Sequence, residues 1–108
     1  MVYKIDYLPS ARADMRGIKE YFAAKSLPGY EKVAALIKAK IVKVAKMPKI
    51  SAVCVFDPRF RQTVAGSYLV FYTIDEEKRR IEIHHIWHSM RNIEHELQLL
   101  REQQQGPL

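Results

Sequence analysis

The chain has 108 residues, 48% of them hydrophobic, which fits one globular domain and excludes two. Its 18 Lys and Arg against 12 Asp and Glu give a formal net charge of +6, which favours a polyanionic partner, either nucleic acid or an acidic protein. The single Cys54 cannot form an intramolecular disulfide, and no apolar run is long enough for a membrane span or a signal peptide. We therefore expect a cytoplasmic protein with no membrane partner.

The first half of the chain predicts a strand followed by two helices. Residues 2–8 are β-branched and aromatic and predict a strand that stops at Pro9, after which Ser10 is the expected N-cap of a helix over residues 10–25. The segment Ser-Leu-Pro-Gly at 26–29 interrupts this pattern. Apolar residues then recur at helical spacing until Pro48, which predicts a second helix over residues 31–47 and an antiparallel helical hairpin.

After Ser51 the pattern changes to short apolar segments. They predict strands at 61–65, 68–74 and 80–88, preceded at 52–56 by a short strand or strand-like segment. The segment 68–74 is apolar on both faces, so we expect a central strand. In the last strand, alternation predicts Ile81, Ile83, His85 and Trp87 on one face and Glu82, His84, Ile86 and His88 on the other.

These elements predict an α+β fold with the order β-α-α-β-β-β, in which a two-helix hairpin packs on a mainly antiparallel sheet. We expect residues 1–92 to form a single domain and residues 93–108 to form a C-terminal helical tail with a frayed end. The tail would close an edge of the core, fold back over the basic face of the sheet, or mediate dimerisation.

The second predicted helix carries lysines along one side. At about 100° per residue, four of them fall within roughly 120° of one another: Lys32, Lys40, Lys43 and Lys46. Such a row of lysines suits contacts to successive phosphates, because each contact releases counterions without reading sequence. The alternative is the solvated face of an ordinary amphipathic helix.

A second group of basic side chains lies on the later strands. It comprises Arg59, Arg61, His84, His85, His88 and Arg91. If the hairpins bring these strand ends together, the group suits RNA cleavage by 2′-hydroxyl attack, which needs a base, an acid and a cation at phosphorus. We take Arg61, His88 and Arg91 as candidate catalytic residues, and Lys40, Lys43, Lys46, Arg59 and His84 as candidate RNA or phosphate ligands. In the alternative, His85 points into the core and His84 is a surface residue.

No cofactor or metal is expected. Neighbouring strand residues point to opposite faces, so His84 and His85 cannot readily hold one ion, and no Cys or carboxylate completes a zinc set. Glycine patterns typical of nucleotide-binding loops are absent, and Cys54 lies in an apolar run unsuited to a nucleophile.

Three segments carry motifs of a known family. The first is Leu-Pro-Ser-Ala-Arg-Ala-Asp at 8–14, followed by Ile18 and Tyr21. The second has Arg61, Val64, Gly66 and the run Tyr-Leu-Val-Phe-Tyr at 68–72, before Ile74 and Asp75; the third is His-Ser-Met-Arg-Asn at 88–92. Together they resemble the RelE/ParE toxins of bacterial type II toxin–antitoxin pairs, the plasmid-stabilisation type, over about residues 3–92.

The resemblance implies a toxin held inactive by a cognate, acidic antitoxin, as a toxin–antitoxin hetero-oligomer or with a homodimeric toxin. It implies two activities on one fold. RelE-like members cut messenger RNA on the ribosome without metal, with an Arg that Arg61 matches and an Arg or His that His88 or Arg91 matches; ParE-like members inhibit DNA gyrase.

The nuclease is the first hypothesis from the sequence, gyrase inhibition the second, and a non-toxic binding module the third. Two departures weaken the first. Leu69 stands where many RNA-cleaving relatives have Arg, and no Tyr follows Arg91.

Overall fold

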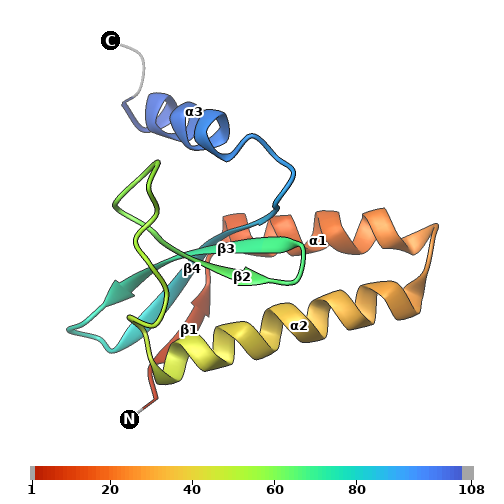
Figure 1. Cartoon of the computed structure of the whole chain (residues 1–108), viewed down its shortest axis with the longest axis horizontal. Coiled ribbons are helices and arrows are strands. Elements are labelled where there is room, and N and C mark those ends of the chain that lie inside the picture. Colours follow the sequence, from red (N-terminus) through yellow and green to blue (C-terminus); the bar gives the residue numbers. More distant parts are fainter. Residues whose placement is uncertain (1, 106–108) are drawn as a thin grey trace.

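The computed structural model describes residues 2–105 as a four-stranded sheet with three helices (Figure 1). In chain order the elements are β1 (Lys4–Tyr7), α1 (Pro9–Ala23), α2 (Leu27–Lys46), β2 (Arg61–Ala65), β3 (Tyr68–Asp75), β4 (Arg80–His88) and α3 (Ile93–Gln105). The strand order is β1-β4-β3-β2, with β1 parallel to β4 and the other pairs antiparallel. The predicted α+β fold and element order are confirmed.

The beginnings of the two hairpin helices differ from the prediction. Helix α1 begins at Pro9, whose fixed φ and missing N–H suit a first turn, so the prediction that Ser10 caps it is wrong. Helix α2 begins at Leu27, earlier than expected, because Ser26 Oγ accepts a hydrogen bond from Gly29 N at 3.0 Å. Pro28 fits the first turn for the same reason as Pro9.

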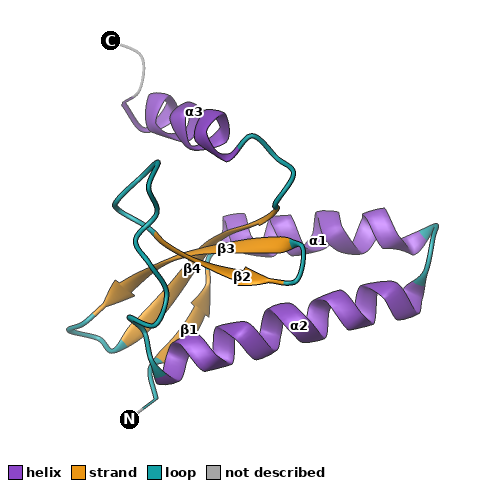
Figure 2. Cartoon of the chain, viewed as in Figure 1, coloured by secondary structure: helices purple, strands orange, loops and turns teal. Residues whose placement is uncertain are grey.

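The helical hairpin covers one face of the sheet (Figure 2). Apolar residues of α1 and α2 meet every second residue of the central strand in one core, whose innermost members include Ile37, Ile41, Val70, Tyr72 and Ile83. Burial of these side chains is the main stabilisation of the hairpin on the sheet.

Helix α3 packs on the opposite face of the sheet. Leu97 is fully buried there in a second core cluster with Cys54, Phe60, Phe71 and Trp87. Strand β3 therefore contributes Tyr72 to one core and Phe71 to the other, which confirms that it is central and apolar on both faces.

Of the two alternatives for residues 52–56, the structure shows the strand-like segment and not a strand of the sheet. This segment makes one isolated bridge, Val53 to Arg61. Cys54 N donates to the carbonyl of Phe60, which precedes β2, and the Ala52 carbonyl accepts from Gln62 N within β2. Its apolar pattern is not that of a buried strand, because only Cys54 is buried while Val55 is 89% exposed.

Strand β4 departs from simple alternation at His84. The pairing of Phe71 with His85 and of Tyr72 with Ile83 leaves His84 as an extra residue, a β-bulge. Beyond it Ile86 joins Ile83 in the hairpin-side core and Trp87 faces α3. The predicted assignment of faces is therefore wrong after the bulge.

Several polar contacts stabilise the long connection between α2 and β2. Tyr72 Oη donates to the Pro48 carbonyl at 2.8 Å and Arg61 Nη1 to the Ser51 carbonyl at 2.7 Å. Asp57, whose side chain is 2% exposed, accepts hydrogen bonds from the Arg59 backbone N–H and guanidinium, the shortest 2.7 Å. These contacts, rather than strand pairing, hold the connection between α2 and β2 in place.

Ionisation of Asp57 makes the free energy of unfolding depend on pH. The Arg59 guanidinium lowers the pKa of this carboxyl below its ordinary value of 3.8. Its contribution is therefore present above that value and is lost as the pH falls through the lower, folded-state pKa. We expect Asp57→Asn to cost about 1–3 kcal/mol near neutral pH. Urea unfolding should show a difference from the wild type that becomes smaller as the pH falls further below 3.8; an unchanged difference would contradict this role.

Among the described residues, no helix is long and apolar enough to cross a membrane.

Candidate functional site

The end of β4 gathers two of the predicted catalytic residues. His88 is exposed, its ring lies 5.2 Å from that of Tyr68 in an edge contact, and its Nδ1 accepts a hydrogen bond from Met90 N. The Arg91 guanidinium lies 5.1 Å from the centre of the Trp87 ring and pairs with Glu96 at 3.4 Å. His88 is thus accessible, while Arg91 is held by an aromatic ring and a carboxylate.

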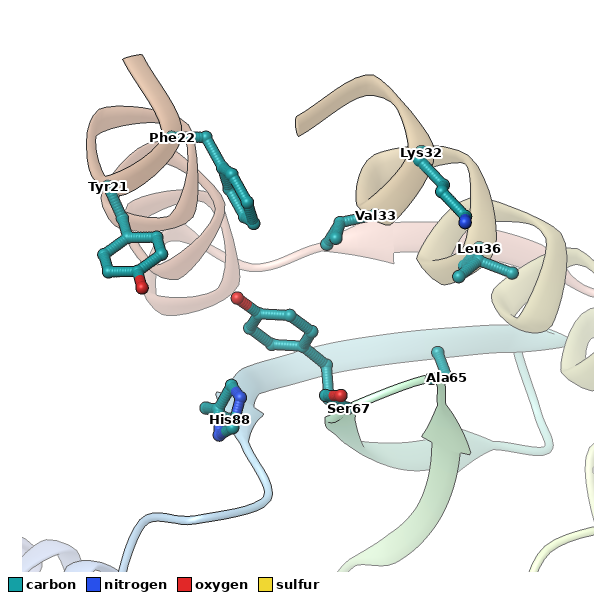
Figure 3. Close-up of a pocket in the computed structure, with 10 residues that line it drawn as sticks. Tyr21, Phe22, Lys32, Val33, Leu36, Ala65, Ser67 and His88 are labelled. Carbon is teal, nitrogen blue, oxygen red and sulfur yellow. The ribbon is translucent and has the colours of Figure 1, made fainter. Parts of the chain in front are cut away.

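Next to His88 lies a pocket of about 630 Å³ between the end of the helical hairpin where α1 is joined to α2 and the β2–β3 turn (Figure 3). We call it the hairpin-end pocket. Its walls are mostly apolar and aromatic, and Lys32 and His88 add positive or ionisable groups at its rim. The lining residues are Tyr21, Phe22, Lys32, Val33, Leu36, Ala65, Gly66, Ser67, Tyr68 and His88.

Gly66 allows the β2–β3 turn to form one wall of the hairpin-end pocket. Its φ of +61° is a left-handed conformation that favours glycine, and the Leu36 side chain packs close by, at 3.4 Å from where a Cβ would be. The turn therefore approaches α2 closely, with Ala65 and Ser67 on either side lining the pocket.

Helix α1 is fixed on β4 by polar contacts in its first two turns. Strand β1 pairs with β4 only as far as Ile83, and beyond that point α1 takes over. Ser10 Oγ donates to the His84 carbonyl at 2.6 Å, and Asp14 Oδ2 accepts from Ile86 N at 3.0 Å and lies 3.2 Å from His85 Nδ1. Ser10 and Asp14 thus satisfy strand groups that would otherwise lack a partner.

Arg61 lies away from this strand end. It pairs with Tyr72 at the start of β2, whereas His88 pairs with Tyr68, which is opposite Ala65 at the other end of β2. Four residues of strand correspond to about 13 Å. The guanidinium is bound to the Ser51 carbonyl, so the structure does not bring Arg61 together with His88 and Arg91.

Arg59 and His84 lie in a third place, both beside the Phe60 ring. The Arg59 guanidinium is 5.4 Å and the His84 ring 5.0 Å from the Phe60 ring. His84 Nε2 contacts Thr73 Oγ1 at 2.8 Å, and burial lowers the pKa of this histidine below 6.5. His84 is thus a half-buried partner of Thr73, whereas His85 contacts Asp14 and its ring lies 4.5 Å from that of Trp87.

The predicted lysines are on α2. Lys43 and Lys46 are exposed and Lys40 is half-buried, while Lys32 is exposed near the beginning of the helix at the pocket. The candidate residues therefore occupy four separate places: the β4 end, the start of β2, the region of Phe60, and α2.

Sequence reasoning missed the aromatic residues of the pocket. Tyr21 is 57% exposed, and Lys25 Nζ lies 3.9 Å from the centre of its ring. Hydrogen bonding and charge from Lys25 lower the pKa of Tyr21. In the sequence, Tyr21 and Phe22 extend the apolar pattern of α1. A tyrosine close to the break between the two helices was the feature that could have indicated a binding residue.

The arrangement is better suited to binding than to proton transfer. An apolar pocket with a few polar groups at its rim is the usual form of a binding site. Among the described residues, no group of three or more His, Cys, Asp and Glu could hold a metal ion.

Comparisons with solved structures show the same fold. The chain superposes on the toxin–antitoxin complex RelBE2 from Mycobacterium tuberculosis with a TM-score of 0.61 at 19% identity, covering 82% of this chain and 99% of that one. For an arginine-to-alanine double mutant of the E. coli toxin RelE in the free state, the TM-score is 0.64 at 19% identity, covering 94% and 98%. The intact E. coli RelBE toxin–antitoxin complex gives 0.57 at 21% identity, covering 82% and 99%.

A search of curated proteins gave no match. The sequence profile of the family described as "ParE toxin of type II toxin-antitoxin system, parDE" matches residues 5–93, a range that includes the helical hairpin and all of the sheet except the first residue of β1. Because that match covers most of the chain, the protein belongs to the ParE toxin family, within the RelE/ParE superfamily of type II toxins.

Proposed function

We propose that this toxin stops growth by docking on DNA gyrase and inhibiting it, not by cutting RNA. One observation carries the proposal: Arg61, the arginine expected at phosphorus, is bound to the Ser51 carbonyl about 13 Å of strand away from His88. Cleavage needs the acid, the base and the cation around one phosphate.

The hairpin-end pocket supports docking on a protein. It combines the exposed Tyr21 with apolar walls and the Lys32 ammonium, and aromatic residues in apolar pockets are typical energetic centres of protein interfaces. We also propose a cognate acidic antitoxin, on the basis of the +6 net charge and of the toxin–antitoxin complexes among the similar structures. The non-toxic binding module remains the outcome if no growth arrest occurs.

Two assays on the same protein test the proposal. Purified protein is added to DNA gyrase with relaxed plasmid and ATP, and the 5′ ends of messenger RNA are mapped by primer extension after pulsed expression in bacteria. We expect loss of supercoiling and unchanged message ends. Codon-phased new ends with normal supercoiling would overturn the proposal in favour of a ribosome-dependent nuclease.

Arg61→Ala separates the two activities further. Because Arg61 supports the connection before β2 and does not meet His88, we expect growth arrest and gyrase inhibition to persist, with a stability loss of about 1–3 kcal/mol from the lost charged hydrogen bond. Growth curves and thermal unfolding of the variant measure both effects. A folded Arg61→Ala protein without toxicity would instead support a catalytic arginine.

A further inference from the structure

The lysines of α2 form a surface that the docking proposal leaves unused apart from Lys32 at the pocket. The helix contains the acid Glu31 near its beginning and no other carboxylate. Among the described residues, none of the four aligned lysines takes part in an ion pair. We call these residues, Lys32, Lys40, Lys43 and Lys46, the lysine stripe.

The stripe runs along the outer side of a well-anchored helix. Ile37, Ile41 and Val44 are buried against the sheet, and the lysines lie on roughly the opposite side of α2. From Lys32 to Lys46 the helix rises about 21 Å, the length of about six base pairs of duplex DNA. The helix is thus a straight support for positive charges, and Figure 1 shows it as the outermost element on its side of the sheet.

The residue types distinguish between partners. Protein interfaces are depleted in lysine and enriched in arginine and aromatic residues, and the stripe contains lysine alone. Proteins that hold single-stranded nucleic acid stack bases on aromatic rings, and α2 has one aromatic residue, Tyr30, which packs against the core. Lys32 has aromatic neighbours in the hairpin-end pocket, but the other three lysines are not among the residues that line it. Lysines without rings for bases to stack on suit the phosphates of a double helix.

We propose that the lysine stripe binds the phosphate backbone of duplex DNA without reading its sequence. Each ammonium neutralises one phosphate and releases its condensed counterions. The interaction does not depend on docking to gyrase, and in a toxin that acts on a DNA-bound enzyme it adds a second contact on the same assembly.

Fluorescence anisotropy of a labelled duplex of about 20 base pairs tests the proposal, with the full-length chain titrated at several KCl concentrations. The test variant carries Lys40→Gln, Lys43→Gln and Lys46→Gln. We expect the wild type to bind at low salt with an affinity that falls as salt rises, and the slope of log K against log[salt] to be smaller by about 2–3 in the variant, since each lost phosphate contact removes about 0.9.

The matched control removes the same charge elsewhere, through Lys4→Gln, Lys19→Gln and Lys78→Gln, all at exposed positions outside α2. Its slope should stay near that of the wild type, and thermal unfolding should show both variants folded. An equal loss of slope in the control would mean that net charge, not the stripe, attracts DNA, and would overturn the proposal.

Two other outcomes would also overturn it. Absence of duplex binding at low salt would do so, as would tighter binding of single-stranded RNA of the same length. Polyglutamate binding that needs these three lysines, without duplex binding, would assign the stripe to an acidic protein. Supercoiling inhibition by the same variants is measured separately, so failure of DNA binding is distinguishable from failure of the gyrase proposal.

Discussion

Replacing Leu97 with alanine is expected to lower the free energy of unfolding by about 3 kcal/mol. Leu97 is fully buried between α3 and the sheet, in contact with the cluster that contains Phe71 and Trp87. The shorter side chain loses the transfer free energy of the removed groups and leaves a cavity that the aromatic rings cannot fill completely. Urea unfolding monitored by Trp87 fluorescence measures the change in the free energy of unfolding, with the reporter in the same core cluster as Leu97.

The matched control is Leu99→Ala, on the same helix at a residue that is 40% exposed. We expect it to cost less than about 1 kcal/mol, because little apolar surface is buried there. If the two variants have equal stability, α3 is not docked on the sheet through Leu97, and the second core does not exist in solution.

Replacing Tyr21 with alanine is expected to raise the toxin concentration that half-inhibits gyrase supercoiling by at least about tenfold, the size typical of an aromatic centre of a protein interface. Tyr21 is 57% exposed and lines the hairpin-end pocket, so the change removes contact surface without opening the core. The supercoiling assay gives the concentration directly, and thermal unfolding checks that the variant is folded.

Leu27→Ala is the control for this effect. Leu27 is 61% exposed at the beginning of α2 and does not line the pocket. We expect inhibition within about twofold of the wild type, as for most exposed residues outside an interface centre. Equal inhibition by the Tyr21 variant would show that the target binds elsewhere, while gyrase inhibition itself would stand.

Local patterns in the sequence predict most of the fold. The helices and the last three strands follow from helical spacing, from β-branched runs and from turn residues, because amphipathic periodicity reports which side of an element is buried. Strand β4 was predicted with its bounds, Arg80–His88, and β3 was recognised as central because both its faces are apolar.

The errors have a common cause in contacts between distant parts of the chain. The bulge at His84 depends on the registers of β3 and β4, and Ser10 bonds to a carbonyl 74 residues away instead of capping its own helix. The segment 52–56 has strand-forming residues, but Cys54 alone is buried, so pairing stops at one bridge.

The candidate functional residues also divide into features that the sequence predicts and features that depend on the tertiary structure. Composition and motif order were sufficient to predict the toxin superfamily, the positive net charge and the row of lysines on α2. These features depend only on residue types and on spacing within one element. Whether Arg61 meets His88, and whether Tyr21 joins Tyr68 in a pocket, was decided by the tertiary structure. Strand register and helix docking set those distances, and both arise from the packing of the whole chain rather than from any local pattern.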